Sequence, residues 1–276
     1  RSDSSTLQTC LEIKYLSGSV KGNENDCHLC DYKHPHTKFL STTAVNCVAF
    51  SPDGIHFASG DTDGEILIWN INNIDDDAIN ITSDLDLDLG NVTAMVYSNP
   101  VTSTGNIELL SAHNDKFGDE EIVVWNANSD DGYNILYYCD PPDGGNINPI
   151  FCLAYNPRWN IFAAGTTYNT DGSVIIWDLD TARDDNPITT PVTTIVYSEN
   201  SAPDITALAY MIDYTDNYIN SDSIASHLAM GTSNGNVVIY QVAGSQSDFT
   251  HGDPWRTICY NVSISSLVYS PTMEFL

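Results

Sequence analysis

The chain has very little positive charge. Its 276 residues include 9 Lys and Arg against 37 Asp and Glu, which gives a formal net charge of −28. Proteins that bind DNA or RNA rely on Lys and Arg to neutralise phosphates. This balance therefore argues against a nucleic-acid partner and favours a basic protein partner.

Long apolar runs are also missing. No stretch approaches the roughly 20 apolar residues that a membrane-spanning helix needs, so we expect no spanning segment. Nothing at the start resembles a signal peptide, and Arg1 is not an initiator Met. We therefore expect the chain to be processed or to be a piece of a longer protein.

Motifs of catalysis are absent as well. The sequence contains no Gly-x-Ser-x-Gly elbow, no His-Glu-x-x-His pair and no Gly-rich phosphate loop. An enzyme could still use acidic residues from neighbouring segments, but no two carboxylates recur at matching places. The sequence predicts a protein that is not an enzyme and holds no cofactor.

A metal site has one candidate. Cys27 and Cys30 are spaced as Cys-x-x-Cys, with His34 and His36 close behind, and such groups can hold zinc. On a predicted strand, however, residues three apart point to opposite faces of the sheet. We interpret these cysteines as packing or oxidised residues and predict no metal.

A second, weaker metal candidate is acidic. Asp84, Asp86 and Asp88 alternate along a predicted outer strand, so their carboxylates share one face. A calcium site would need several oxygens in a loop. A solvated strand face explains the pattern without a metal.

The chain does contain a repeated three-stranded unit. In residues 45–70, a strand at 45–50 leads through Ser-Pro-Asp-Gly to a strand at 55–60, and Asp-Gly at 63–64 predicts a hairpin into a strand at 65–70. The first strand recurs at 92–97, 150–155, 205–210 and 264–269, and the third at 122–126, 174–178 and 237–241. The repeats therefore start near 45, 92, 150, 205 and 264.

When the repeats are aligned, the residues at equivalent positions predict how the repeats pack. The third position of the first strand is always small: Cys47, Ala94, Cys152, Ala207 and Ser266. The sixth position is always aromatic: Phe50, Tyr97, Tyr155, Tyr210 and Tyr269. Nearly continuous apolar strands with small residues at fixed places indicate sheets buried on both faces. The sequence predicts an all-β fold, a β-propeller of four-stranded antiparallel blades.

Several motifs carry a family resemblance. Ser-Pro-Asp-Gly at 51–54, Ala-Ser-Gly at 58–60, Ile-Trp-Asn at 68–70 and Trp177-Asp178 resemble the WD40-repeat β-propeller family, with divergent repeats. The resemblance implies a scaffold for protein–protein interaction, usually seven-bladed. No Gly-His precedes a first strand, so it also implies an incomplete buried hydrogen-bond relay among His, Ser or Thr, Trp and Asp.

The domain prediction is a single WD40-like propeller over residues 1–276. Residues 1–44 read as the back part of a further blade, with strands at 14–18 and 27–32. The two ends could complete a fifth blade together, or the chain could be part of a longer propeller. Residues 273–276 duplicate a strand that residues 11–18 already supply, which favours the longer propeller.

The predicted partner-binding face lies at the turns between second and third strands, together with the residues that enter each first strand. Loops on a rigid scaffold are where binding residues concentrate. The residues predicted on this face are Asp61, Thr62, His113, Lys116, Tyr168, Asn169, Thr232 and Asn234.

An alternative function is a structural subunit of an extracellular surface assembly or fibre, in which the partners are further copies of the chain. Asn-x-Ser/Thr sequons at Asn80, Asn91 and Asn261 are candidate N-glycosylation sites, although a chain rich in Asn and Thr also produces sequons by chance. The scarcity of Lys and the abundance of Asn, Ser, Thr and Tyr favour an extracellular location over the cytoplasm.

Overall fold

The computed structural model describes the strands of the repeated unit and the turns that join them. The described residues are 43–73, 78–83, 89–100, 106–114, 120–128, 132–139, 149–157, 159–168, 171–179, 191–197, 203–211, 226–243, 250–251 and 253–269. The chain divides into two units, Arg1–Ala44 and Val45–Leu276, and the sheets that the structure describes lie in the second. The predictions for residues 1–42, including Cys27, Cys30, His34 and His36, and for Asp84, Asp86 and Asp88, lie outside the described residues.

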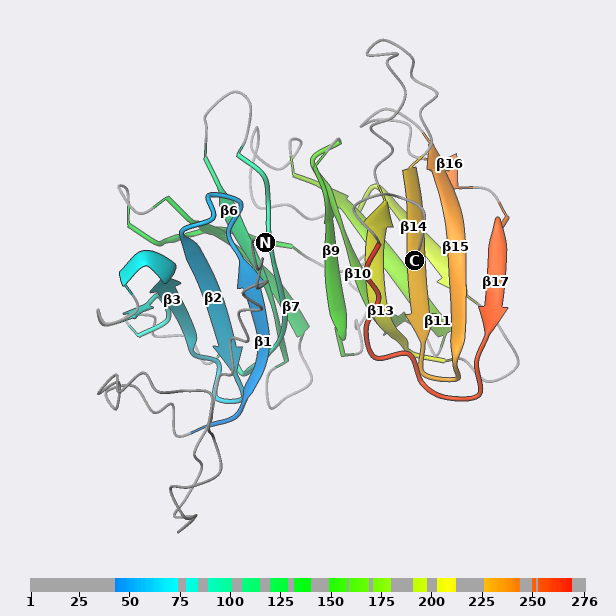
Figure 1. Cartoon of the computed structure of the whole chain (residues 1–276), viewed down its shortest axis with the longest axis horizontal. Helices are drawn as coiled ribbons and strands as arrows, with labels where there is room; N and C mark the ends of the chain where they lie inside the picture. Colours follow the sequence, from blue (N-terminus) through cyan, green and yellow to red (C-terminus); the bar gives the residue numbers. More distant parts are fainter. Residues whose placement is uncertain are drawn as a thin grey trace, which may run out of the picture. The chain divides into compact units, whose positions relative to one another are not determined.

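Four antiparallel sheets follow one another along the chain and are arranged as a propeller, as Figure 1 shows. Blade 1 comprises β1 (Val45–Phe50), β2 (His56–Asp61), β3 (Ile66–Asn70) and β4 (Ile79–Asn80), with a 3-10 turn, η1 (Ile71–Asn73), after β3. Blade 2 comprises β5 (Asn91–Tyr97), β6 (Glu108–Asn114), β7 (Glu120–Asn126) and β8 (Ile135–Cys139). Blade 3 comprises β9 (Cys152–Asn156), β10 (Ile161–Tyr168), β11 (Asp171–Asp178) and β12 (Thr193–Tyr197).

Blade 4 departs from the pattern at its outer edge. It comprises β13 (Ile205–Met211), β14 (Ser226–Thr232) and β15 (Asn236–Ala243), and the outer position is shared by β16 (Thr250–His251) and β17 (Arg256–Cys259). β16 pairs with the end of β15, and β17 pairs with its beginning. The prediction of an all-β propeller with four-stranded antiparallel blades is confirmed.

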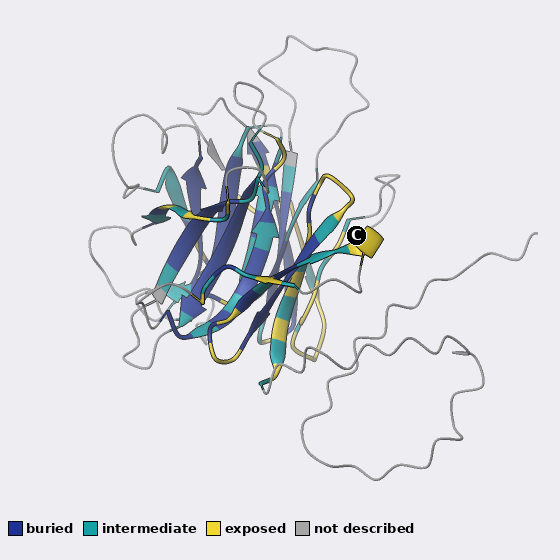
Figure 2. Ribbon diagram, turned by 90° about the vertical axis from the view of Figure 1, so that its left-hand side faces the viewer, coloured by how far each residue is buried: buried dark blue, intermediate teal, exposed yellow. Residues whose placement is uncertain are grey.

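Consecutive blades pack face to face. We call the side of each sheet that carries Trp69, Trp125, Trp177 or Tyr240 its Trp face. In one buried cluster, the Trp face of blade 2 contacts the opposite face of blade 1, and equivalent clusters join blade 2 to blade 3 and blade 3 to blade 4. Each blade therefore presents its Trp face to the preceding blade, and buried residues run through the stacked strands (Figure 2).

Small residues allow this close stacking. A Cβ atom on Gly60 would lie 2.5 Å from Val92 Cγ1, and one on Gly231 would lie 2.5 Å from Ile264 Cγ2. On Gly165 it would lie 2.5 Å from Cys152 Sγ and 2.8 Å from Ile205 Cγ2. Val92, Ile205 and Ile264, each the first residue of a repeat, thus fit against a glycine in the second strand of the blade before. Blade 2 has Ala112 at the equivalent position.

The fifth repeat begins as the others do but forms no strand. The Ile264 N–H donates to the carbonyl of Thr232 at 3.1 Å, and the Thr206 hydroxyl donates to the Ile264 carbonyl. Residues 264–269, predicted as a strand, have no regular secondary structure. A strand is defined by a hydrogen-bonded neighbour, and the described residues supply no second strand to this segment.

Candidate partner-binding face

The turns between the second and third strands share one construction in blades 1 and 4. The Asp61 carboxylate accepts the N–H groups of Asp63 and Glu65 at 3.0 and 2.9 Å. In blade 4 the Thr232 hydroxyl oxygen accepts the N–H of Asn236 at 2.8 Å. A buried side-chain oxygen at the end of the second strand therefore fixes each turn, as short polar side chains do in Asx and ST turns.

A glycine completes both turns. Gly64 and Gly235 have φ of +89° and +93°, which side-chain-bearing residues rarely adopt. A Cβ atom would lie 2.5 Å from the Gly90 carbonyl oxygen at Gly64, and 2.2 Å from the Tyr260 carbonyl oxygen at Gly235. Each turn is therefore fixed by a hydrogen bond to a side chain of its own blade, and it packs against the segment that leads into the next repeat.

The structure places the predicted face residues in two groups. Asp61, His113 and Thr232 are buried and form hydrogen bonds inside the fold. Thr62 and Asn234 are exposed at the tips of their turns. Tyr168 ends β10, and Lys116 and Asn169 lie outside the described residues.

His113 belongs to a buried hydrogen-bond chain. The Trp125 indole N–H donates to Ser111 Oγ at 2.7 Å, and Ser111 Oγ lies 2.7 Å from His113 Nε2. Ser111 Oγ therefore accepts from Trp125 and also contacts the imidazole, which joins the three side chains in one chain of polar contacts. Burial lowers the pKa of His113 to about 4, although the backbone of Gly90 partly opposes this shift.

The Trp125–Ser111–His113 contacts resemble the buried relay among His, Ser or Thr, Trp and Asp that the sequence implied to be incomplete. The histidine of this relay does not come from a Gly-His pair before a first strand. The sequence predicted His113 on the face formed by the turns between second and third strands, whereas it lies within β6, Glu108–Asn114. The signal was present: Ser111 and His113 are two residues apart, so a strand places them on one face.

The relay is shorter in the neighbouring blades. In blade 1 the Trp69 indole N–H donates to Ser59 Oγ at 2.9 Å. In blade 3 the equivalent position is Ala164, and the buried Trp177 indole N–H has no hydrogen-bond partner among the described residues. Within the described blades, the Trp–Ser bond therefore depends on which residue occupies this one position of the second strand.

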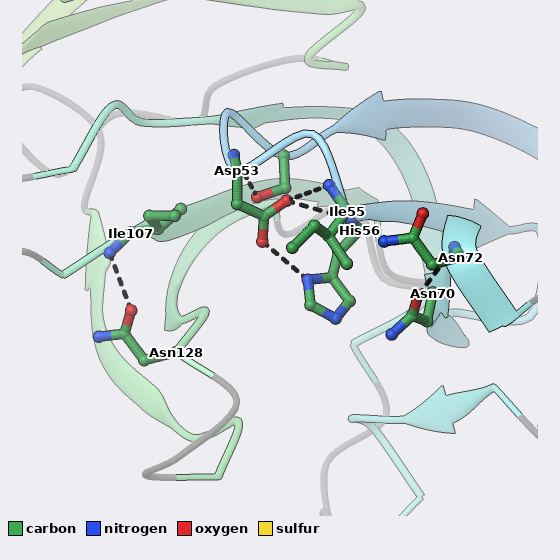
Figure 3. Close-up of polar contacts among 8 residues, drawn as sticks. Asp53, Ile55, His56, Asn70, Asn72, Ile107 and Asn128 are labelled. Atoms are coloured by element: carbon green, nitrogen blue, oxygen red, sulfur yellow. Dashed lines mark hydrogen bonds and ion pairs between the residues drawn. The ribbon is translucent and has the colours of Figure 1, made fainter.

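The opposite end of blade 1 is fixed by the Ser-Pro-Asp-Gly turn (Figure 3). Asp53 accepts the N–H groups of Ile55 and His56 at 2.7 and 3.0 Å, and its other oxygen lies 2.7 Å from His56 Nδ1. Partial burial alone would raise the pKa of Asp53, but these hydrogen bonds outweigh it and hold the pKa below its usual value. The Asp53–His56 pair stabilises a turn, and we assign it no further chemistry.

The three sequons differ in their surroundings. The side-chain oxygen Oδ1 of Asn80 accepts from the N–H and the hydroxyl of Thr82, and its side-chain amide Nδ2 donates to Glu65 at 3.2 Å. Asn91 accepts from Asn46 across the junction of blades 1 and 2. Asn261 is exposed, between β17 and the fifth repeat.

Among the described residues no group of His, Cys, Asp or Glu is arranged to hold a metal ion. Cys47, Cys139, Cys152 and Cys259 are free thiols. In the part of the chain that the structure describes, no helix is both long and apolar enough to cross a bilayer.

Four antiparallel sheets that follow one another along the chain and stack face to face define a β-propeller. Residues 32–70 match the family model described as WD domain, G-beta repeat. A comparison with curated proteins found no match. The described part of the chain has a β-propeller fold, and residues 32–70 match a WD40 repeat. WD40 propellers are generally non-catalytic scaffolds that bind protein partners.

Proposed function

We propose that this propeller is a non-enzymatic scaffold that presents the turns between its second and third strands to a protein partner. The construction of these turns carries the proposal. Buried Asp61 and Thr232 anchor them, and glycines pack them against the following repeat. The exposed tips, which include Thr62 and Asn234, are therefore held in fixed register, and this preorganisation lowers the entropy cost of binding.

The charge of the face indicates the kind of partner. Asp63 and Glu65 are exposed on the blade 1 turn. Among the described residues Arg256, on β17, is the sole Lys or Arg. A basic protein segment complements such a face, and electrostatic attraction would raise its association rate at low salt.

Charge reversal tests the proposal with a defined ligand. Binding of a Lys/Arg-rich peptide would be measured by calorimetry for the wild type, Asp63→Lys and Asp253→Lys, the last an exposed acid at the outer edge of blade 4. We expect Asp63→Lys to weaken binding about tenfold, a loss of about 1.4 kcal/mol, and Asp253→Lys to change it far less. Equal losses in the two variants would mean non-specific attraction and would refute this face.

A second candidate function is a glycosylated structural subunit outside the cell. The exposure of Asn261 supports it, because an attached glycan there would meet solvent. The intact mass of protein purified from its native source would be compared before and after enzymatic deglycosylation. A loss of glycan mass that maps to Asn261 supports this candidate, and an unmodified Asn261 counts against it.

A further inference from the structure

The sequence contains one Asn-Gly pair, Asn234-Gly235, and it lies in the turn between β14 and β15. Asn234 is exposed at the tip of this turn. In such a pair the backbone nitrogen of the glycine can attack the side-chain amide carbon of the asparagine, because the glycine has no side chain to hinder the approach. Every other Asn of the chain precedes a residue that has a side chain. Asn234 therefore has the least hindered route to deamidation.

The reaction needs water and no other reactant. The Gly235 nitrogen forms a bond to Cγ of Asn234, and the side-chain nitrogen leaves as ammonia with the proton of the Gly235 N–H, which closes a cyclic imide. Water then adds to either carbonyl carbon of the ring and breaks its bond to the ring nitrogen. The products are aspartate and isoaspartate. Each carries a carboxylate in place of the amide, which adds one negative charge at neutral pH.

The folded turn restrains both reacting groups. The Gly235 N–H donates to the Thr232 carbonyl oxygen at 3.1 Å. Asn234 Oδ1 accepts from the Thr232 hydroxyl at 2.6 Å and from Asn236 Nδ2 at 3.3 Å. Closure of the imide requires rotation about the bond between Cα and the carbonyl carbon of Asn234, and this rotation would break the bond between Gly235 and Thr232. The closed turn therefore slows the attack.

Packing of the glycine opposes the same rotation. Gly235 is buried, and its carbonyl oxygen accepts the Tyr260 N–H at 2.6 Å. A Cβ atom on Gly235 would lie 2.2 Å from the Tyr260 carbonyl oxygen and 2.7 Å from that of Val262, so the backbone of the following segment lies directly against it. The peptide group of Gly235 can turn only when this contact opens. Local opening of this kind then sets the rate of the reaction.

We propose that Asn234 is a site of spontaneous deamidation whose rate is set by opening of the turn at Thr232–Asn236. The turn of blade 1 has the aspartate form of the product at the same place, Asp63 before Gly64, with the same hydrogen bond from the glycine N–H. An aspartate at position 234 fits the closed turn, because the two groups that donate to Oδ1 bind a carboxylate more strongly than an amide oxygen. The reaction adds negative charge to the partner-binding face proposed above, but the inference does not depend on that function.

Peptide mass spectrometry of the whole chain after incubation tests the proposal. Wild-type protein is kept at one mildly alkaline pH, folded or in urea, and digested, and the replacement of NH by O is followed at Asn234 and Asn261. Asn261 is the internal control, because it is also exposed but precedes Val262, whose branched side chain hinders the attack. We expect deamidation at Asn234 to be at least about tenfold faster in urea than in the folded protein. In urea it should also exceed deamidation at Asn261.

Two variants locate the restraint in the turn. Thr232→Val removes the hydroxyl that bonds Asn234 Oδ1, whereas Thr232→Ser keeps it. We expect the folded Thr232→Val protein to deamidate at Asn234 about fivefold faster than folded Thr232→Ser, the effect of one hydrogen bond. If Thr232→Val does not fold, the comparison of folded and unfolded wild type decides alone. Equal rates in those two states, equal rates in the two folded variants, or no excess over Asn261 in urea would each overturn the proposal.

Discussion

Trp177 differs from Trp69 and Trp125 in that no serine hydroxyl among the described residues accepts its indole N–H. Trp69 and Trp125 donate their indole N–H groups to Ser59 and Ser111, whereas Ala164 occupies the equivalent place beside Trp177. A buried donor without a partner loses the free energy of a hydrogen bond, about 1–3 kcal/mol. The blade 3 position is therefore a natural place for a stabilising substitution.

Ala164→Ser is expected to raise the free energy of unfolding by about 1 kcal/mol, because the new hydroxyl can accept from Trp177. Urea denaturation measures the change. Ala163→Ser is the control, since Ala163 is equally buried but points to the other face of β10. A gain in the control, or a loss of stability in Ala164→Ser, would contradict the role assigned to this hydroxyl.

His113 links stability to pH. Burial lowers its pKa to about 4, so between pH 6.5 and 4 the unfolded chain binds a proton that the folded chain does not. Its contribution to stability is fully present above pH 6.5 and falls as the pH drops through this window, by roughly 3 kcal/mol in total. The buried imidazole should therefore make the protein acid-sensitive.

The measurement is urea denaturation of the wild type and His113→Gln at pH 7 and pH 5. The variant keeps a polar side chain beside Ser111 but cannot titrate. We expect the variant to lose less stability than the wild type on acidification. Identical losses would show that other groups cause the pH dependence.

At the scale of the element, first strands were the easiest to predict. β1 has the predicted bounds, because the mainly apolar residues 45–50 end at a Ser-Pro-Asp-Gly turn, in which Asp53 accepts the N–H groups of Ile55 and His56. The outer strands were harder, since no residue type recurs at fixed positions along them. β4 has two residues, and β16 and β17 share the outer position of blade 4.

The turns proposed to form the partner-binding face were predictable in position but not in construction. The sequence predicted the turn between the second and third strands of blade 1, because Asp-Gly at 63–64 marks a hairpin. It did not show that Asp61 and Thr232 turn inward to anchor those hairpins. A short polar side chain at a turn can either bond the backbone or face solvent, and only the fold decides between them.

The junction between blades is the element that tolerates change least. A Cβ atom on Gly165 would lie 2.9 Å from the Ile205 carbonyl oxygen, a backbone atom that cannot move aside alone. Gly165→Ala is expected to lower the free energy of unfolding by about 1–3 kcal/mol. Gly54→Ala is the control: its Cβ would meet nothing within 4 Å, and it tests only the cost of φ at +69°.

Chemical denaturation compares the two glycine variants. A larger loss at Gly165 than at Gly54 supports a tight junction between blades 3 and 4. A smaller loss at Gly165 would mean that blades 3 and 4 can separate slightly at no cost in stability. That result would contradict the close packing of Gly165 against Ile205.

At the scale of the whole molecule, the account depends on blades that hold one another in place. Three apolar clusters join the four blades, and the turns at Gly64 and Gly235 are packed against the segments that link one repeat to the next. The scaffold proposed here works only if these junctions are stiff. Their stiffness in turn depends on small residues at fixed positions, such as Ala207 beside Gly231.

The most direct test of this claim compares the thermal unfolding of Ala207→Trp with that of Val196→Trp. The second variant is the control, because Val196 is exposed. Ala207 is 3% exposed, and the Cβ of a side chain at Gly231 would already lie 3.3 Å from it, so an indole cannot fit without separating blade 4 from the following repeat. The account predicts a midpoint at least about 5 °C lower for Ala207→Trp than for Val196→Trp. An unchanged midpoint for Ala207→Trp would contradict the stacking of blades through their small residues.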